Sequence, residues 1–84
     1  MIQISKKFLR KTVLVKWLDA SGDSHWRDAA DAEAHTLSSI EEVGFLWSIR
    51  KDSILIVSAI SDKGNVNGVG AIPIVNIQSI KQLK

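Results

Sequence analysis

The sequence predicts a mainly β fold: a small, partly closed, five-stranded barrel with one short helix after the first strand. Three observations favour this fold. Short apolar segments alternate in the manner of strands, turn signals separate most of them, and a proline precedes the last apolar segment. A chain of 84 residues without cysteine forms one small domain without disulfides. Closure into a barrel would remove most of the exposed strand edges.

Alternating apolar residues identify the first two predicted strands. In the segment Thr12–Asp19, Val13, Val15 and Trp17 are expected to share one face. The β-branched and aromatic content favours a strand with one well-buried face. In the second strand, within SSIEEVGFLWSIR, four large residues are expected to share one face, namely Val43, Phe45, Trp47 and Ile49. Leu46 is expected on the opposite face. Gly44 interrupts the pattern and predicts a bulge or a sharp bend of the sheet.

Between these two strands, residues 24–35 (SHWRDAADAEAH) predict a short helix on the surface. Its alanines favour a helix, Ser24 is the expected N-cap, and Trp26 is the expected anchor. Asp28 and Asp31 lie near the start of this helix, where the helix dipole favours carboxylates.

Turn signals delimit the rest of the chain. Turns at 50–52 and 62–65 separate three further predicted strands, Ser53–Ser61, Val66–Ile72 and Ile77–Leu83. Proline cannot donate to a central ladder, so Pro73 ends the fourth strand. A single 3₁₀ turn is expected before the fifth strand. This ending resembles the one between the last two strands of SH3-like and Sm-like barrels.

Two sequence resemblances add to this prediction. The segments VKWLDA, WRD, VGFL and IPIVNIQSIKQL resemble a group of small, mostly uncharacterised bacteriophage-encoded proteins with the patterns W-x-D, V-G-x-L and I-P-x-x-x-I-x-x-I-x-x-L. The last pattern is carried by Ile72, Pro73, Ile77, Ile80 and Leu83. This resemblance covers most of residues 13–83 and implies a phage or prophage accessory protein, but no particular activity. Ile74 departs from the group, in which a basic residue often follows the proline.

The second resemblance is to Sm-like proteins. VNGVGAIPI is similar to their second motif, in which an apolar residue, a basic residue and glycine precede an apolar strand. Here Asn67 stands in place of the basic residue, and the first Sm motif has no convincing match. The RNA contacts of Sm-like proteins are therefore not carried over to any residue of this chain.

Charge is distributed unevenly along the chain, although the net charge is only +2. Five basic residues and no acid precede Asp19, whereas residues 19–42 contain seven acids and Arg27 alone as a base. Residues 1–12 are therefore assigned to a basic N-terminal arm and residues 13–84 to the β domain. The asymmetry indicates either an ordinary solvated surface or an arm that meets an acidic partner. Such a partner would be nucleic acid, a nucleotide or a neighbouring subunit's acidic segment.

The candidate ligand-binding residues are aromatic or basic: Trp26, Arg27, Lys6, Lys7, Arg10 and Lys11. An exposed Trp26 would stack on a base or anchor a protein interface; otherwise it would cover one end of the barrel. Arg27 would contact phosphate or stay solvated. Trp17 and Trp47 are in register with apolar neighbours and are expected in the core.

No residue spacing points to catalysis or to a metal. The phosphate-loop and G-x-S-x-G patterns are absent. Asp31 and His35 would share a helix face, but spacing places no third ligand beside them, so a surface pair is expected. The chain is thus expected to be non-enzymatic and to need no cofactor. With no cleavable leader and no bilayer-spanning segment identified, a location in the cytoplasm of a bacterial host is expected.

The leading functional prediction is a phage-type binding module. It would capture a small anionic ligand, such as a nucleotide, or occupy a host protein, as counter-defence proteins do. Alternatives are an Sm-like nucleic-acid binder and a structural or adaptor subunit of a virion. A homo-oligomer is as well supported as a monomer, because a small chain with 45% apolar residues and three tryptophans has few other ways to bury apolar surface.

Overall fold

The computed structural model describes residues 2–20 and 26–83. Strands dominate this part of the chain, with one short α-helix and two 3₁₀ turns. In chain order the elements are η1 (Lys6–Phe8), β1 (Thr12–Asp19), α1 (Ala29–Glu33), β2 (Ser38–Ile49), β3 (Ser53–Val57), β4 (Ala59–Ile60), β5 (Val66–Asn67), β6 (Gly70–Pro73), η2 (Ile74–Asn76) and β7 (Ile77–Gln82). The mainly β fold and the single short helix after the first strand are confirmed.

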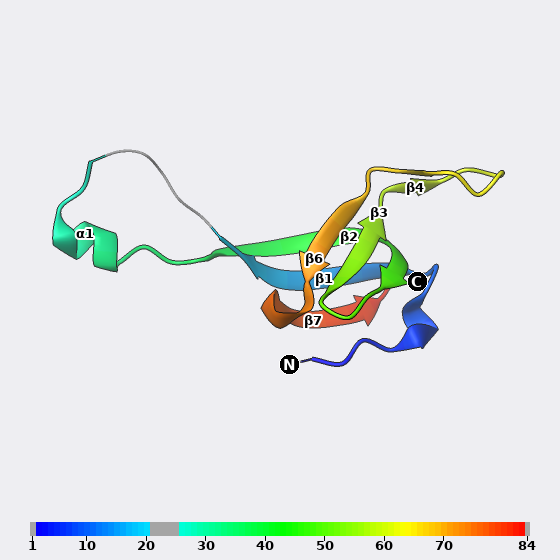
Figure 1. The fold of residues 1–84 in the computed structure, drawn as a ribbon, viewed down its shortest axis with the longest axis horizontal. Helices are drawn as coiled ribbons and strands as arrows, with labels where there is room; N and C mark the ends of the chain where they lie inside the picture. Colours follow the sequence, from blue (N-terminus) through cyan, green and yellow to red (C-terminus); the bar gives the residue numbers. More distant parts are fainter. Residues whose placement is uncertain (1, 21–25, 84) are drawn as a thin grey trace.

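The five longer strands form one antiparallel sheet in the order β6-β3-β2-β1-β7, while β4 and β5 pair separately as a small ribbon (Figure 1). Four of these strands follow one another across the sheet, and β7 returns to lie beside β1. Within the described residues no ladder joins β6 to β7, so these two strands are the edges of the sheet.

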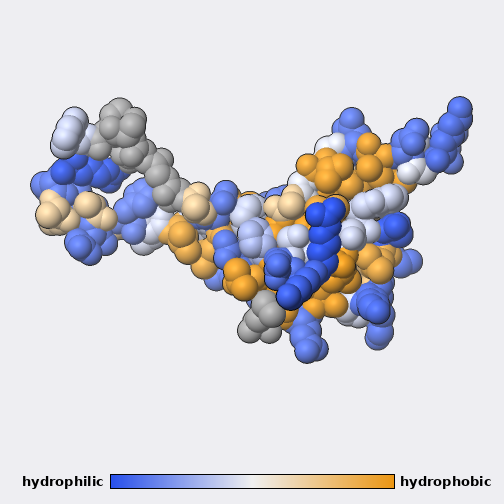
Figure 2. Space-filling model, viewed as in Figure 1, coloured by the Kyte–Doolittle hydropathy of each residue, from blue (hydrophilic) through white to orange (hydrophobic). Residues whose placement is uncertain are grey.

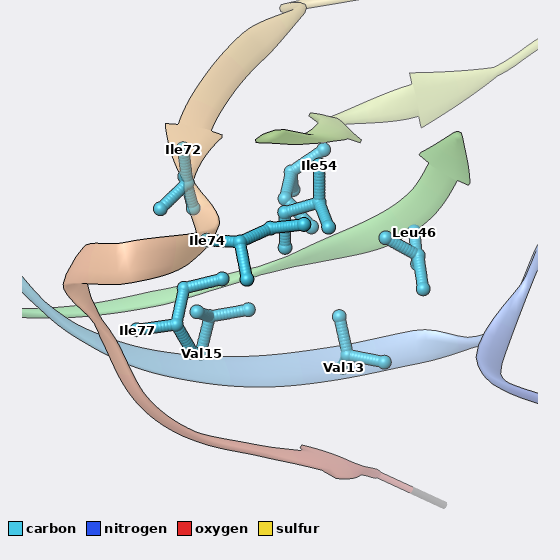
Figure 3. Close-up of a cluster of buried hydrophobic side chains, with 8 residues drawn as sticks. Val13, Val15, Leu46, Ile54, Ile72, Ile74 and Ile77 are labelled. Carbon is cyan, nitrogen blue, oxygen red and sulfur yellow. The ribbon is translucent and has the colours of Figure 1, made fainter. Parts of the chain in front are cut away.

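The core lies on one face of this sheet. Figure 3 shows its side chains converging from β1, β2, β3, β6, η2 and β7. Its members are aliphatic and buried: Val13, Val15, Leu46, Ile54, Ile56, Ile72, Ile74 and Ile77. Val13 and Val15 alternate along β1 as predicted, and Trp17, on the same face, packs partly buried against the cluster. The β1 expectation is therefore confirmed.

The N-terminal arm is packed onto this core. Ile2, Ile4, Phe8 and Leu9 are partly buried against the core cluster. Backbone hydrogen bonds secure the end of the arm at Leu46, whose carbonyl accepts from the Arg10 N–H at 2.7 Å and whose N–H donates to the Lys11 carbonyl at 3.0 Å. The basic side chains of the arm therefore project from a backbone that is held against the sheet.

Strand β2 contains a bulge, but at Trp47 instead of Gly44. Leu46 pairs with Ile56 and Ser48 pairs with Leu55, so Trp47 is the extra residue on the β2 side. A bulge of this kind changes which face the following residues occupy. This local change could not be located from alternation alone.

The predicted face of β2 is consequently wrong in part. Leu46 is fully buried, whereas Val43, expected on the face opposite to Leu46, is 58% exposed. Ile49 nevertheless packs against the same core as Leu46, because the bulge at Trp47 lies between them. The strand therefore places residues three apart on one face, which strict alternation forbids.

Gly44 has a different role from the one predicted. The β1–β2 register runs through the Val13–Gly44 pair without a shift. A Cβ built at Gly44 would lie 2.9 Å from the Val57 carbonyl oxygen and would also collide with the Ile56 side chain. The glycine is needed because the neighbouring strand β3 approaches closely.

Two predicted strands are each divided. Ser53–Ser61 becomes β3 and β4, and Val66–Ile72 becomes β5 and β6. Gly68 has a positive φ of 69°, which bends the chain between β5 and β6. Ser58, the residue between β3 and β4, lies next to this glycine. A Cβ at position 68 would be only 2.8 Å from the Ser58 Cβ.

The predicted ending of the chain is confirmed. Pro73 ends β6 and serves as the N-cap position of the 3₁₀ turn η2, and β7 follows at once. The turn is anchored because Ile74 is buried and its N–H donates to the Asp52 carbonyl at 2.9 Å. Ile77, the first residue of β7, returns to the core.

The helix α1 is shorter than predicted. It spans Ala29–Glu33 and is capped by Asp28, whose carboxylate accepts from the Asp31 N–H at 2.9 Å. Ser24, the expected cap, lies outside the described residues. None of the α1 residues is buried. Because packing of an apolar face supplies most of the stability of a helix, α1 stays short. In the described part of the chain, no helix has the length and hydropathy needed to cross a membrane.

Candidate functional site

A shallow, open pocket lies where the N-terminal arm meets β2. It has a volume of about 460 Å³ and is lined by Lys6, Leu9, Arg10, Trp47, Ser48 and Ile49. We call it the arm pocket. Pockets that hold small molecules fall in this size range. Apolar side chains of Leu9, Trp47 and Ile49 contribute to its lining together with two cations, and none of the six residues is acidic.

The bulge in β2 creates one side of this pocket. Trp47 is the extra residue of this bulge, and its backbone carbonyl is bonded by a side chain of the arm. The Arg10 guanidinium donates a hydrogen bond to that carbonyl through Nη1. The same guanidinium lies over the Trp47 ring, with its central carbon 3.7 Å from the ring centroid. Trp47, predicted to be a core residue, is instead half-buried and supports a cation at the surface.

Arg10 has an unusual backbone conformation. Its φ of 67° lies in the left-handed region, which residues other than glycine seldom adopt. The conformation is held on both sides, since the Arg10 N–H bonds Leu46 and its side chain bonds Trp47. Such strain is often found at functional sites. Here the residue with this conformation has its guanidinium on the aromatic ring and lines the pocket.

The remaining cations of the arm extend this surface. Lys6, Lys7 and Lys11 are exposed, and in the described ranges 2–20 and 26–83 they form no ion pair. Lys16, which follows them along β1, differs because its Nζ lies 3.6 Å from Glu41 Oε1 across the strand pair. The arm thus carries three exposed lysines without an ion pair among the described residues.

Trp26 and Arg27 lie far from the arm. Figure 1 shows α1, which follows them closely in the chain, at one end of an elongated molecule, whereas η1 (blue) lies toward the other end. The molecule measures 53 × 25 × 25 Å. Trp26 is fully exposed at 101%, so the expectation that it anchors the helix, or covers a barrel end, is wrong. One copy of the chain therefore does not bring together all the predicted ligand-binding residues.

Replacing Arg10 by lysine tests the arrangement of the pocket. Lysine keeps the charge but cannot lie flat on Trp47 while donating to its carbonyl. We expect a loss of about 1 kcal/mol in the free energy of unfolding, measured by urea denaturation. Lys7→Arg, a conservative change at an exposed position of the same arm, is the control and should leave stability unchanged. Equal stability of the two variants would show that the stacked guanidinium contributes nothing.

The arrangement is suited to recognition of an anion next to a flat or apolar group. Guanidinium and ammonium groups bind phosphate or carboxylate, and the apolar lining accommodates a ring. No group of three or more metal-ligating side chains occurs in the described part of the chain. His25, which precedes Asp31 and His35 in the chain, lies outside it.

Four of the six residues that line the pocket were missed by reasoning from the sequence. Lys6 and Arg10 were predicted, but Leu9, Trp47, Ser48 and Ile49 were not. One sequence signal could have indicated the bulge. Leu46 and Ile49 are both aliphatic, although strict alternation places residues three apart on opposite faces of a strand. Comparisons with protein-family models, with curated proteins and with solved structures found no match for this chain.

Proposed function

We propose that this protein is a non-enzymatic binding module that captures a small anionic ligand, such as a nucleotide, in the arm pocket. The observation that carries this proposal is the pairing of two cations, Lys6 and Arg10, with an apolar lining that includes Trp47 and has no acidic residue. Lys6 and Arg10 would bind the phosphate, and the base would pack against the apolar side.

Arg10 is well prepared for this role. A guanidinium has several N–H donors, and the bond to the Trp47 carbonyl uses only one nitrogen. Stacking on Trp47 fixes the plane of the group before the ligand arrives, which lowers the entropic cost of binding. A phage origin and a counter-defence role in the cytoplasm of a bacterial host belong to the same proposal, and they rest on the sequence patterns alone.

Calorimetric titration with adenosine and uridine monophosphates tests the proposal. We expect Lys6→Ala and Arg10→Ala each to weaken binding about tenfold, the loss typical of one charge-assisted hydrogen bond. Lys63→Ala, which removes an exposed lysine from the turn before β5, is the matched control and should bind like the wild type. Absence of binding to either nucleotide, or full affinity of the Lys6 variant, would contradict the proposal.

A nucleic-acid binder is the second candidate. It is favoured by Lys7 and Lys11, which are exposed and continue the positive surface beyond the pocket. If four cations of the arm contact phosphates of a single strand, the logarithm of the affinity should fall with the logarithm of salt concentration with a slope of about −3. Salt-insensitive binding of an oligonucleotide would exclude this candidate.

We also propose that the sheet closes into an SH3-like or Sm-like barrel. This is supported by the strand order β6-β3-β2-β1-β7 and by the 3₁₀ turn that connects the two edge strands. Side chains of β6, η2 and β7 converge with those of β1 on one core (Figure 3). Pairing of β6 with β7 would be the remaining step to closure.

A further inference from the structure

The segment that carries Trp26 projects away from the sheet. We define the acidic limb as residues 26–37, which contain α1. Every residue of the limb is exposed, including Trp26 and Leu37. Figure 2 shows that the strongly hydrophobic residues gather over the sheet, whereas the limb is mainly hydrophilic. Trp26 therefore leaves a large apolar side chain in contact with water, and exposed apolar surface of this kind is typical of a site that contacts another molecule.

The limb and the arm are complementary in charge. The limb has three carboxylates, on Asp28, Asp31 and Glu33, against the single guanidinium of Arg27. The arm has four cations, on Lys6, Lys7, Arg10 and Lys11, and no acid. Because α1 lies at one end of the long axis and η1 lies toward the other end, these charges cannot meet within one copy in this conformation (Figure 1).

We propose that the acidic limb of one copy docks on the arm pocket of a second copy of this chain. Trp26 would enter the pocket and pack against Leu9 and Ile49, while the limb carboxylates would face the lysines of the arm. Tryptophan and arginine are the residues that most often dominate binding energy at interfaces. Complementary charge would fix the orientation and speed the encounter.

This contact joins two different surfaces, so each copy keeps one free limb and one free arm pocket. Such a head-to-tail interface forms a ring if the rotation between copies closes, and an open chain if it does not. The contact does not require a nucleotide. A nucleotide in the arm pocket would compete with the limb, and binding of each would then weaken the other.

Sedimentation of the full chain at low and high salt is the first test. At about 50 mM salt we expect the average mass to rise above the 9.3 kDa monomer as concentration increases. At about 0.5 M salt the mass should return toward that of the monomer, because screening weakens contacts between exposed charges. A monomer at every concentration in low salt would overturn the proposal.

A mixing experiment identifies the two surfaces. The limb variant combines Trp26→Ala, Asp31→Asn and Glu33→Gln, and it keeps Asp28 because that side chain caps α1. The arm variant combines Lys6→Gln, Lys7→Gln and Lys11→Gln, all at exposed positions. Each variant alone should be monomeric, since it lacks one half of the interface.

The mixture of the two variants should form a heterodimer and nothing larger. The arm variant supplies an intact limb, and the limb variant supplies an intact arm pocket, so one interface per pair can form. Circular dichroism of each variant confirms that it is folded. A mixture that stays monomeric, or association of either variant alone at the wild-type level, would overturn the proposal. Neither result depends on whether nucleotides bind.

Discussion

Replacing Leu46 by alanine is expected to lower the free energy of unfolding by about 3–5 kcal/mol. Leu46 is one of the largest fully buried side chains in the described part of the protein. Its truncation would leave a cavity among Val13, Ile54 and Ile56, which come from the two strands that flank β2. A domain of this size is marginally stable, so the loss would be a large part of the total.

Urea denaturation followed by tryptophan fluorescence measures this loss. Val43→Ala, three residues earlier in β2, is the matched control because Val43 is 58% exposed. We expect it to change stability by no more than about 0.5 kcal/mol. A larger loss for Val43→Ala than for Leu46→Ala would mean that β2 presents the other face to the core, as simple alternation predicts.

The Leu46 variant also affects the candidate site. The backbone of Leu46 holds Arg10 and Lys11, and Arg10 in turn lies on Trp47. A cavity that lets β2 shift would therefore loosen the arm pocket. If the arm pocket binds a nucleotide as proposed above, the folded fraction of Leu46→Ala should bind it more weakly than the wild type. Unchanged affinity would contradict this coupling between the core and the pocket.

Gly44→Ala is expected to destabilise the protein by about 2–3 kcal/mol, although alanine normally suits a strand better than glycine. The added Cβ would lie 2.9 Å from the Val57 carbonyl oxygen and would collide with the Ile56 side chain. The Val57 carbonyl is part of the backbone and cannot rotate away as a side chain would, so β2 and β3 would have to separate. The midpoint of urea denaturation reports the loss.

Gly70→Ala is the control for this glycine. Gly70 also lies in a strand, at the start of β6, and its φ is not positive. The nearest atom to a new Cβ there is Glu42 Oε2 at 3.7 Å, an ordinary contact distance. We expect Gly70→Ala to be neutral or slightly stabilising, since alanine reduces the entropy of the unfolded chain. A Gly44 variant as stable as this control would show that β3 does not approach β2 closely.

Local sequence patterns were sufficient for the secondary structure of much of the chain. Alternation identified β1 and the burial of Val13 and Val15, and the restriction of proline to strand ends identified the sequence of β6, η2 and β7. These are local properties, since each depends on residues next to one another in the chain. The predicted face of β2 was wrong in part, because a single extra residue at Trp47 changes the phase of everything after it.

The sequence by itself determined the mainly β class, most strand positions, the uneven charge and two of the six residues of the arm pocket. Only the tertiary structure decided that Gly44 serves a close approach of β3, that Arg10 lies on Trp47, and that α1, with the segment before it, lies far from the arm. The physical reason is that alternation and turn chemistry act between neighbours. The pocket instead depends on contacts between residues such as Arg10 and Trp47, which are 37 positions apart and meet only when the sheet forms.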